Sequence, residues 1–79
     1  MSNVVKLNED AVYARLGASV RELREGLQLS QAELAHLANV NRVTLARIET
    51  GRTGVTVAVL ARLALAMDTT PAALIEDIL

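Results

Sequence analysis

The sequence predicts an all-α fold, a compact bundle of five helices with short connections. Hydrophobic residues make up 52% of its 79 positions, and Ala, Leu and Val dominate among them. Phe and Trp are absent and there is a single Tyr, which is typical of a helix bundle rather than of an aromatic-rich sheet. Apolar residues also recur every three or four positions through most of the chain, which is the period of an amphipathic helix.

The first helix is expected to begin at Asp10, after an N-terminal arm over residues 1–9 that has no sustained hydrophobic period. We expect this arm to be flexible, because chain ends without apolar anchors usually fray. Residues 10–79 then form one domain, since a chain of this length has no room for a second. The inner face of the first helix is an apolar stripe at helical spacing: Val12, Leu16, Val20, Leu23 and Leu27.

Two short helices follow, each preceded by a residue suited to capping. Ser30, with an acidic residue three positions later, forms a capping box that begins a helix over residues 31–38. Asn39 tolerates the left-handed conformation that ends this helix, and Asn41 caps the next one over residues 42–49. Two helices joined by such a tight turn meet the requirement for a helix-turn-helix unit.

Two further helices complete the predicted fold. Gly51 is expected in the left-handed conformation that ends the third helix. Thr56 caps a fourth helix over residues 57–67. Thr70 is the expected cap of the last helix, and Pro71 fits its first position because proline lacks the N–H that would be unbonded there.

The composition argues against an enzyme, a cofactor site and a metal site. The chain has no Cys and one histidine, His36, so it offers neither a thiolate metal site nor a nucleophile with a nearby base. No apolar run reaches the ~18 residues of a membrane helix. No signal peptide is recognisable either, so we expect a cytoplasmic protein without a membrane partner.

Two motifs identify the helix-turn-helix more closely. Residues 30–35 read SQAELA and residues 45–51 read LARIETG, with Val40 between them. In combination they resemble the Cro/repressor, or xenobiotic-response-element, family of DNA-binding regulators over about residues 16–74. The resemblance implies a lambda-repressor-like fold that binds double-stranded DNA as a homodimer and regulates transcription. The sequence departs from the family at Gln28 and Asp68, where glycine is common.

The resemblance also implies a role for individual residues, because it makes the third helix the recognition helix in the major groove. It places four residues at base edges: Asn41, Arg42, Val43 and Arg47. It places four others at DNA phosphates: Gln31, Thr44, Arg52 and Thr53. It pairs Arg24 with Glu49 in a partly buried salt bridge between the first and third helices.

The charge distribution bears on how strongly one subunit would bind. The net charge is −1, yet arginines concentrate around the third helix while the last segment is acidic. One subunit would therefore neutralise few phosphates, so a dimer that reads two half-sites is expected. A surplus of apolar residues near the C-terminus is the expected dimer interface: Leu65, Ile75, Ile78 and Leu79.

Several small regulators share this pattern, and the residues do not choose among them. Controller proteins of restriction–modification systems, phage Cro-like repressors and antitoxins are all compatible, with the controller interpretation slightly preferred. A toxin or RNA polymerase would then be a further partner. The alternative of a different class is a helical protein-interaction module that does not bind DNA.

Overall fold

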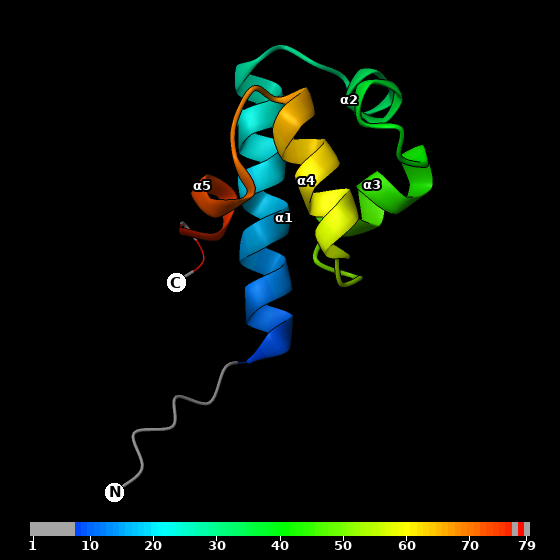
Figure 1. The fold of residues 1–79 in the computed structure, drawn as a ribbon. Coiled ribbons are helices and arrows are strands. Elements are labelled where there is room, and N and C mark those ends of the chain that lie inside the picture. Colours follow the sequence, from blue (N-terminus) through cyan, green and yellow to red (C-terminus); the bar gives the residue numbers. More distant parts are fainter. Residues whose placement is uncertain (1–7, 77, 79) are drawn as a thin grey trace, which may run out of the picture.

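The computed structural model describes residues 8–76 and residue 78. Over these residues the chain is all-α, and its five helices are α1 Glu9–Gly26, α2 Gln31–Ala38, α3 Arg42–Glu49, α4 Val57–Ala66 and α5 Pro71–Glu76. The long helix α1 is central, with α5 on one side of it and the α2–α3 pair on the other (Figure 1). The predicted fold class and helix order are confirmed.

Helix α1 begins one residue earlier than predicted. Asn8 is extended, and its side-chain Oδ1 accepts a hydrogen bond from the backbone N–H of Ala11 at 3.2 Å. Because Asn is a favourable N-cap, this bond starts the helix at Glu9. Residues 1–7 of the predicted arm lie outside the described residues.

The inner face of α1 differs from the predicted apolar stripe in its last two turns. Leu16 and Val20 are buried as expected, but Leu23 is 37% exposed and Leu27 is 48% exposed. Arg24, only 8% exposed, occupies the buried position that follows Val20 by one turn. The prediction was wrong here because hydrophobicity alone does not register an arginine that pairs with a buried carboxylate.

Helices α1 and α3 approach each other closely at Gly17. A Cβ atom added at Gly17 would collide with the carbonyl oxygen of Ile48 and would lie 2.8 Å from that of Glu49. Only glycine leaves room for the α3 backbone at this contact. This residue therefore sets how deeply α3 lies against α1.

The predicted boundaries of α2 and α3 are confirmed by their caps. Ser30 and Glu33 form both hydrogen bonds of the capping box. The backbone N–H of Ser30 donates to Glu33 Oε1 at 2.9 Å, and the backbone N–H of Glu33 donates to Ser30 Oγ at 3.0 Å. Asn39 has φ 53° and Gly51 has φ 72°, so both adopt the expected left-handed conformation. These two turns determine where the helix-turn-helix unit begins to bend and where α3 ends.

Two further left-handed residues carry a side chain, Gln28 with φ 59° and Asp68 with φ 55°. They follow the C-terminal ends of α1 and α4. These are the positions at which the sequence departs from the glycine common in the resembled family. Gln is poorly suited to this conformation, whereas Asp tolerates it better.

The C-terminal part of the fold requires one correction to the predicted dimer interface. Helix α4 ends at Ala66, with Met67 as its C-cap, and Thr70 caps α5 as predicted. Beyond α5, a side-chain N–H of Arg15 donates to the carbonyl oxygen of Ile78 at 3.2 Å. Ile78 is thereby 6% exposed and belongs to the core, so its assignment to an exposed patch was wrong.

Candidate nucleic-acid interface

Helix α3 has an inner side that builds the core and an outer side that faces solvent. On the inner side Leu45 and Ile48 are 0% and 1% exposed. The outer side consists of exposed residues from the N-cap and first turn together with one residue of the next turn: Asn41, Arg42, Val43, Thr44 and Arg47. We call these five residues the reading face. All four residues predicted at base edges lie on it.

The amide of Asn41 is committed to the helix that it begins. Its Oδ1 accepts hydrogen bonds from the backbone N–H groups of Val43 at 2.8 Å and of Thr44 at 3.4 Å. These are two of the N–H groups that have no partner inside a helix. Asn41 therefore fixes the N-terminal turn of α3, and only its Nδ2 amino group is free to bind another molecule.

Three arginines on and beside α3 carry uncompensated charge. Arg42, Arg47 and Arg52 are exposed, and within the described residues their side chains form no ion pair. The adjacent carboxylate, Glu49, is 7% exposed and faces inward. The outward surface around α3 is therefore positive although the whole chain carries a net charge of −1.

Behind the reading face, Arg24 and Glu49 form the ion pair that the resemblance implied. Arg24 Nε lies 2.7 Å from Glu49 Oε2, and Arg24 Nη2 lies 3.0 Å from Oε1, so the pair is bidentate. Arg24 Nη1 also donates to the carbonyl oxygen of Leu29 at 2.8 Å. The hydrogen bonds that Arg24 donates to the Glu49 carboxylate raise the pKa of Arg24 above its ordinary value.

Glu49 also binds helix α2, in addition to its ion pair with α1. The side-chain Nε2 of Gln31, the first residue of α2, donates to Glu49 Oε1 at 3.0 Å. One carboxylate therefore joins the end of α1, the start of α2 and the end of α3. The family resemblance implied the ion pair but not this contact with Gln31, and residue spacing alone gives no signal for side-chain bonding between separate helices.

The predicted phosphate contacts surround α3. Gln31 lies at the N-terminus of α2, where the first backbone N–H groups point out of the helix and favour an anion. Its hydrogen bond to Glu49 places this end of α2 beside the end of α3. Arg52 and Thr53 lie in the loop that follows, after Thr50 and Gly51. Thr44 lies at the opposite end of α3, on the reading face.

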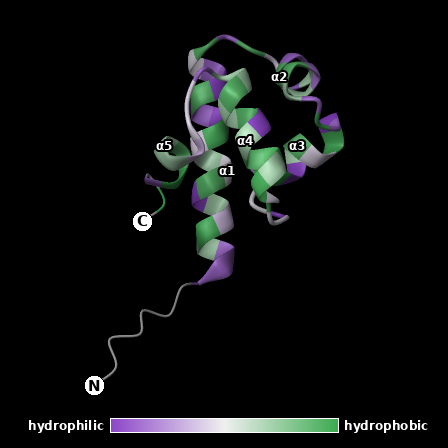
Figure 2. Ribbon diagram, viewed as in Figure 1, coloured by the Kyte–Doolittle hydropathy of each residue, from purple (hydrophilic) through white to green (hydrophobic). Residues whose placement is uncertain are grey.

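The other residues predicted at the dimer interface are exposed where the structure describes them. Leu65 on α4 is 75% exposed and Ile75 on α5 is 39% exposed. Leu79 lies outside the described residues. Figure 2 shows α4 as mostly hydrophobic along its length, and Val57 at its start is 82% exposed. Exposed apolar side chains are thus present on α4 and α5.

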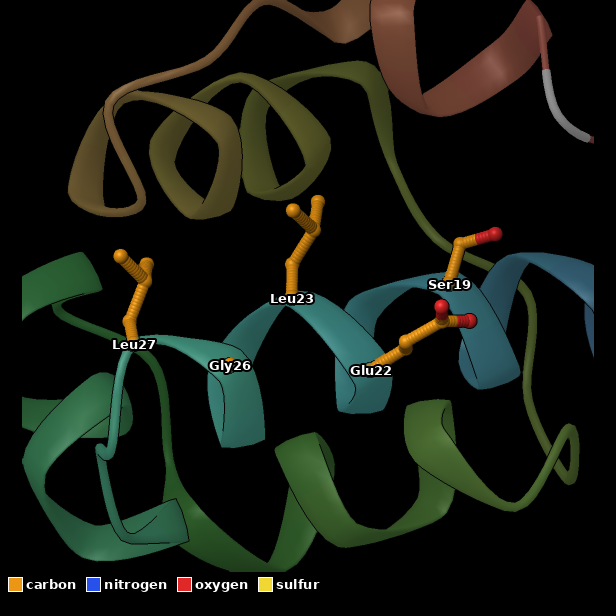
Figure 3. Close-up of a pocket in the computed structure, with 5 residues that line it drawn as sticks. All are labelled: Ser19, Glu22, Leu23, Gly26 and Leu27. Carbon is orange, nitrogen blue, oxygen red and sulfur yellow. The ribbon is translucent and has the colours of Figure 1, made fainter.

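A shallow pocket of about 500 Å³ lies along α1 and was not anticipated from the sequence. Its lining comes from α1 and the C-cap residue of that helix: Ser19, Glu22, Leu23, Gly26 and Leu27. Figure 3 shows the side chains of Leu23 and Leu27 pointing in the same direction. The pocket includes the two residues that were wrongly expected in the core. It contains none of the predicted DNA-contacting residues.

Comparison with known proteins agrees with this arrangement. The model of the helix-turn-helix domain family matches residues 15–77, and the chain belongs to this family. A crystal structure of the restriction–modification controller protein C.AhdI from Aeromonas hydrophila is 34% identical, with a TM-score of 0.77, over 78% of this chain and 94% of that chain. The search of curated proteins found no significant match.

Two other solved regulators share the fold. The clp gene regulator ClgR from Corynebacterium glutamicum is 27% identical, with a TM-score of 0.81, over 85% of this chain and 71% of that chain. An HTH_3 family transcriptional regulator from Vibrio cholerae is 23% identical, with a TM-score of 0.81, over 87% of this chain and 39% of that chain. The chain is thus a helix-turn-helix domain of the transcription-regulator type and not an enzyme. Among the described helices, none is long and apolar enough to cross a membrane.

Proposed function

We propose that this protein regulates transcription by binding a near-palindromic DNA operator as a homodimer. The observation that carries the proposal is the reading face. Within the described residues its two arginines have no ion-pair partner. They project from a helix whose buried side is bonded through Glu49 to α1 and α2. Arginine is the side chain best suited to bind the O6 and N7 atoms of guanine with two hydrogen bonds.

Each predicted contact has a distinct role in this proposal. Arg42 and Arg47, with Val43, meet base edges in the major groove, while Asn41 caps the helix that presents them and keeps only its Nδ2 free for a contact. The other contacts hold phosphates and set the register on the duplex: Gln31, Thr44, Arg52 and Thr53. The bond between Gln31 and Glu49 supports this division, because it links the phosphate contact at α2 rigidly to α3.

The second subunit is proposed to pack against Leu65 and Ile75. Both are exposed apolar side chains on a chain whose own core is small. With Leu79 they form the proposed dimer interface, from which Ile78 is removed because it is buried. A dimer also supplies the phosphate contacts that one subunit lacks. Sedimentation at tens of micromolar should give about twice the chain mass of 8.5 kDa, and a monomer throughout that range would rule the dimer out.

The 34% identity to a restriction–modification controller favours a controller protein among the small regulators. An antitoxin or a Cro-like repressor would use the same reading face. A gene for a methyltransferase or endonuclease beside this one supports the controller, whereas an adjacent toxin gene supports the antitoxin and names its protein partner. RNA polymerase would be the partner if the protein activates transcription.

The function is tested by comparing two arginine variants on cognate and scrambled duplexes at several salt concentrations. Arg47→Ala should cost about 1–3 kcal/mol on the cognate duplex and relax preference at one base pair in each half-site. Arg52→Ala should weaken binding to all sequences alike and reduce the salt slope by about one unit per phosphate contact removed.

The outcome also decides between the two classes of function. If Arg47→Ala weakens cognate and scrambled duplexes equally, Arg47 contacts the backbone and the assignment of base reading is wrong. If the protein itself binds no duplex even at low salt, DNA binding is excluded and the protein is an interaction module.

A further inference from the structure

The reading face offers hydrogen-bond donors to DNA but almost no acceptors. Arg42 and Arg47 are pure donors, because a guanidinium has five N–H groups and no lone pair to offer. Val43 is apolar. The only side-chain acceptors on the face are Asn41 Oδ1 and the hydroxyl of Thr44.

The acceptor of Asn41 is already occupied. A carbonyl oxygen has two lone pairs, and Oδ1 accepts from two backbone N–H groups of α3. An asparagine that specifies adenine needs Oδ1 to accept from the adenine amino group while Nδ2 donates to N7. Asn41 could do this only by releasing its cap, which would leave both N–H groups of the first turn without a partner.

The hydroxyl of Thr44 can accept a hydrogen bond, but it does not select one base over another. Its hydroxyl can donate or accept by rotating, so it fits any polar base edge. Within the described residues, the carboxylate closest along the chain to the reading face is Glu49, which faces inward and is held by Arg24 and Gln31. A carboxylate is the side chain that would accept from the amino group of cytosine.

We infer, on the basis of the proposed function, that the reading face recognises its operator with donors only, so that guanines define each half-site and no adenine or cytosine is read through its amino group. Guanine is the base that presents two adjacent acceptors, O6 and N7, in the major groove. Arg42 and Arg47 lie five residues apart, about 140° around the helix, so they read different base pairs. Each half-site therefore carries two specified guanines. Val43 adds apolar contact that suits a thymine methyl group.

The inference assigns Asn41 a positioning role rather than a role in reading adenine. Its cap orients the first turn of α3, from which Arg42 projects. Its free Nδ2 can donate to an acceptor on a base or a phosphate, and this single bond does not distinguish adenine N7 from guanine N7.

The experiment selects binding sites from a pool of random-sequence duplexes with the wild type and with Asn41→Ser, which keeps a hydroxyl acceptor for the cap but lacks the amide. Thermal melts first establish that the variant folds as the wild type does. Both proteins should select the same motif, with two guanines per half-site, and Asn41→Ser should bind it within about tenfold of the wild type. Replacing either guanine with 7-deazaguanine, which lacks the N7 acceptor, should weaken binding by about tenfold.

Arg47→Ala is the matched variant that removes a reading donor and leaves the cap intact. It should lose the preference for one of the two guanines and keep the other. A motif without guanine would overturn the inference, as would an adenine that the wild type requires and Asn41→Ser does not. If the wild type enriches no motif and binds no duplex of the pool at low salt, the proposed function itself fails.

Discussion

The two sides of α3 use arginine in opposite ways. On the inner side, Arg24 reaches across from α1, is 8% exposed and binds Glu49 through two nitrogens. On the outer side, Arg47 is exposed and its side chain forms no ion pair within the described residues. A charge that is buried must be paired and hydrogen-bonded, whereas a charge left unpaired at the surface remains available for another molecule. The inner side therefore holds the fold, whereas the outer side remains available for the proposed contact with DNA.

The largest expected effect comes from removing the buried carboxylate. Glu49→Ala leaves Arg24 buried without its partner and frees Gln31, so it should lower the free energy of unfolding by roughly 3 kcal/mol or more. The matched change on the outer side, Arg47→Ala, should alter it by less than about 0.5 kcal/mol. Urea denaturation of both variants measures the difference, and comparable losses would contradict the contrast between the two sides.

The next effect concerns how closely α3 lies against α1. Gly17→Ala places a methyl group against the carbonyl oxygens of Ile48 and Glu49, so α3 must shift outward at an expected cost of about 1–3 kcal/mol. Gly26→Ala is the control in the same helix, because no atom lies within 4 Å of its added Cβ. It should instead stabilise α1 by up to about 1 kcal/mol. A Gly17→Ala variant as stable as the wild type would show that this contact does not set the helix spacing.

A smaller effect, of opposite sign, is expected at the turn between Arg24 and the start of α2. Gln28 has φ 59°, and replacing it with glycine removes the steric cost of that conformation. Gln28→Gly should therefore raise the free energy of unfolding by about 0.5 kcal/mol after the larger chain entropy of glycine is subtracted. Gln28→Ala keeps the steric cost and should give no gain. Equal melting temperatures for the two variants would refute this explanation.

The smallest effect comes from Glu33, an exposed carboxylate that contrasts with the buried Glu49. Its hydrogen bonds with the backbone N–H and the side chain of Ser30 lower the pKa of Glu33 below its ordinary value of 4.5. The capping box therefore adds stability at pH values above the unfolded-state pKa, and this contribution is lost as the pH falls through the lower folded-state pKa.

Glu33→Gln tests this pH dependence because glutamine can still cap but cannot ionise. Thermal melts should show the wild type as the more stable protein at neutral pH and the two as equally stable in strong acid. A difference that does not change with pH would mean that ionisation of Glu33 makes no contribution.

Local features of the sequence determined where the helices begin and end. Ser30 and Asn41 cap α2 and α3 as predicted, and Asn39 and Gly51 take the left-handed conformations that end them. These outcomes depend on each residue's own φ preference and on hydrogen bonds that span at most three residues. The exposed positions of the reading face follow from the same information, since the period of α3 sets which side chains can face inward.

Which residues are buried, unlike where the helices begin and end, was decided only by the tertiary structure. Leu23 and Leu27 fit the hydrophobic period of α1, yet both are exposed, and Arg24 lies inward because Glu49, 25 positions later, supplies its counter-charge. The family resemblance implied this ion pair, but the apolar period of α1 did not. Ile78 was expected in an exposed apolar patch, yet it is buried, and its carbonyl oxygen accepts a hydrogen bond from Arg15 of α1. Burial depends on which helices meet in space, and residue spacing along one helix carries no information about its partner.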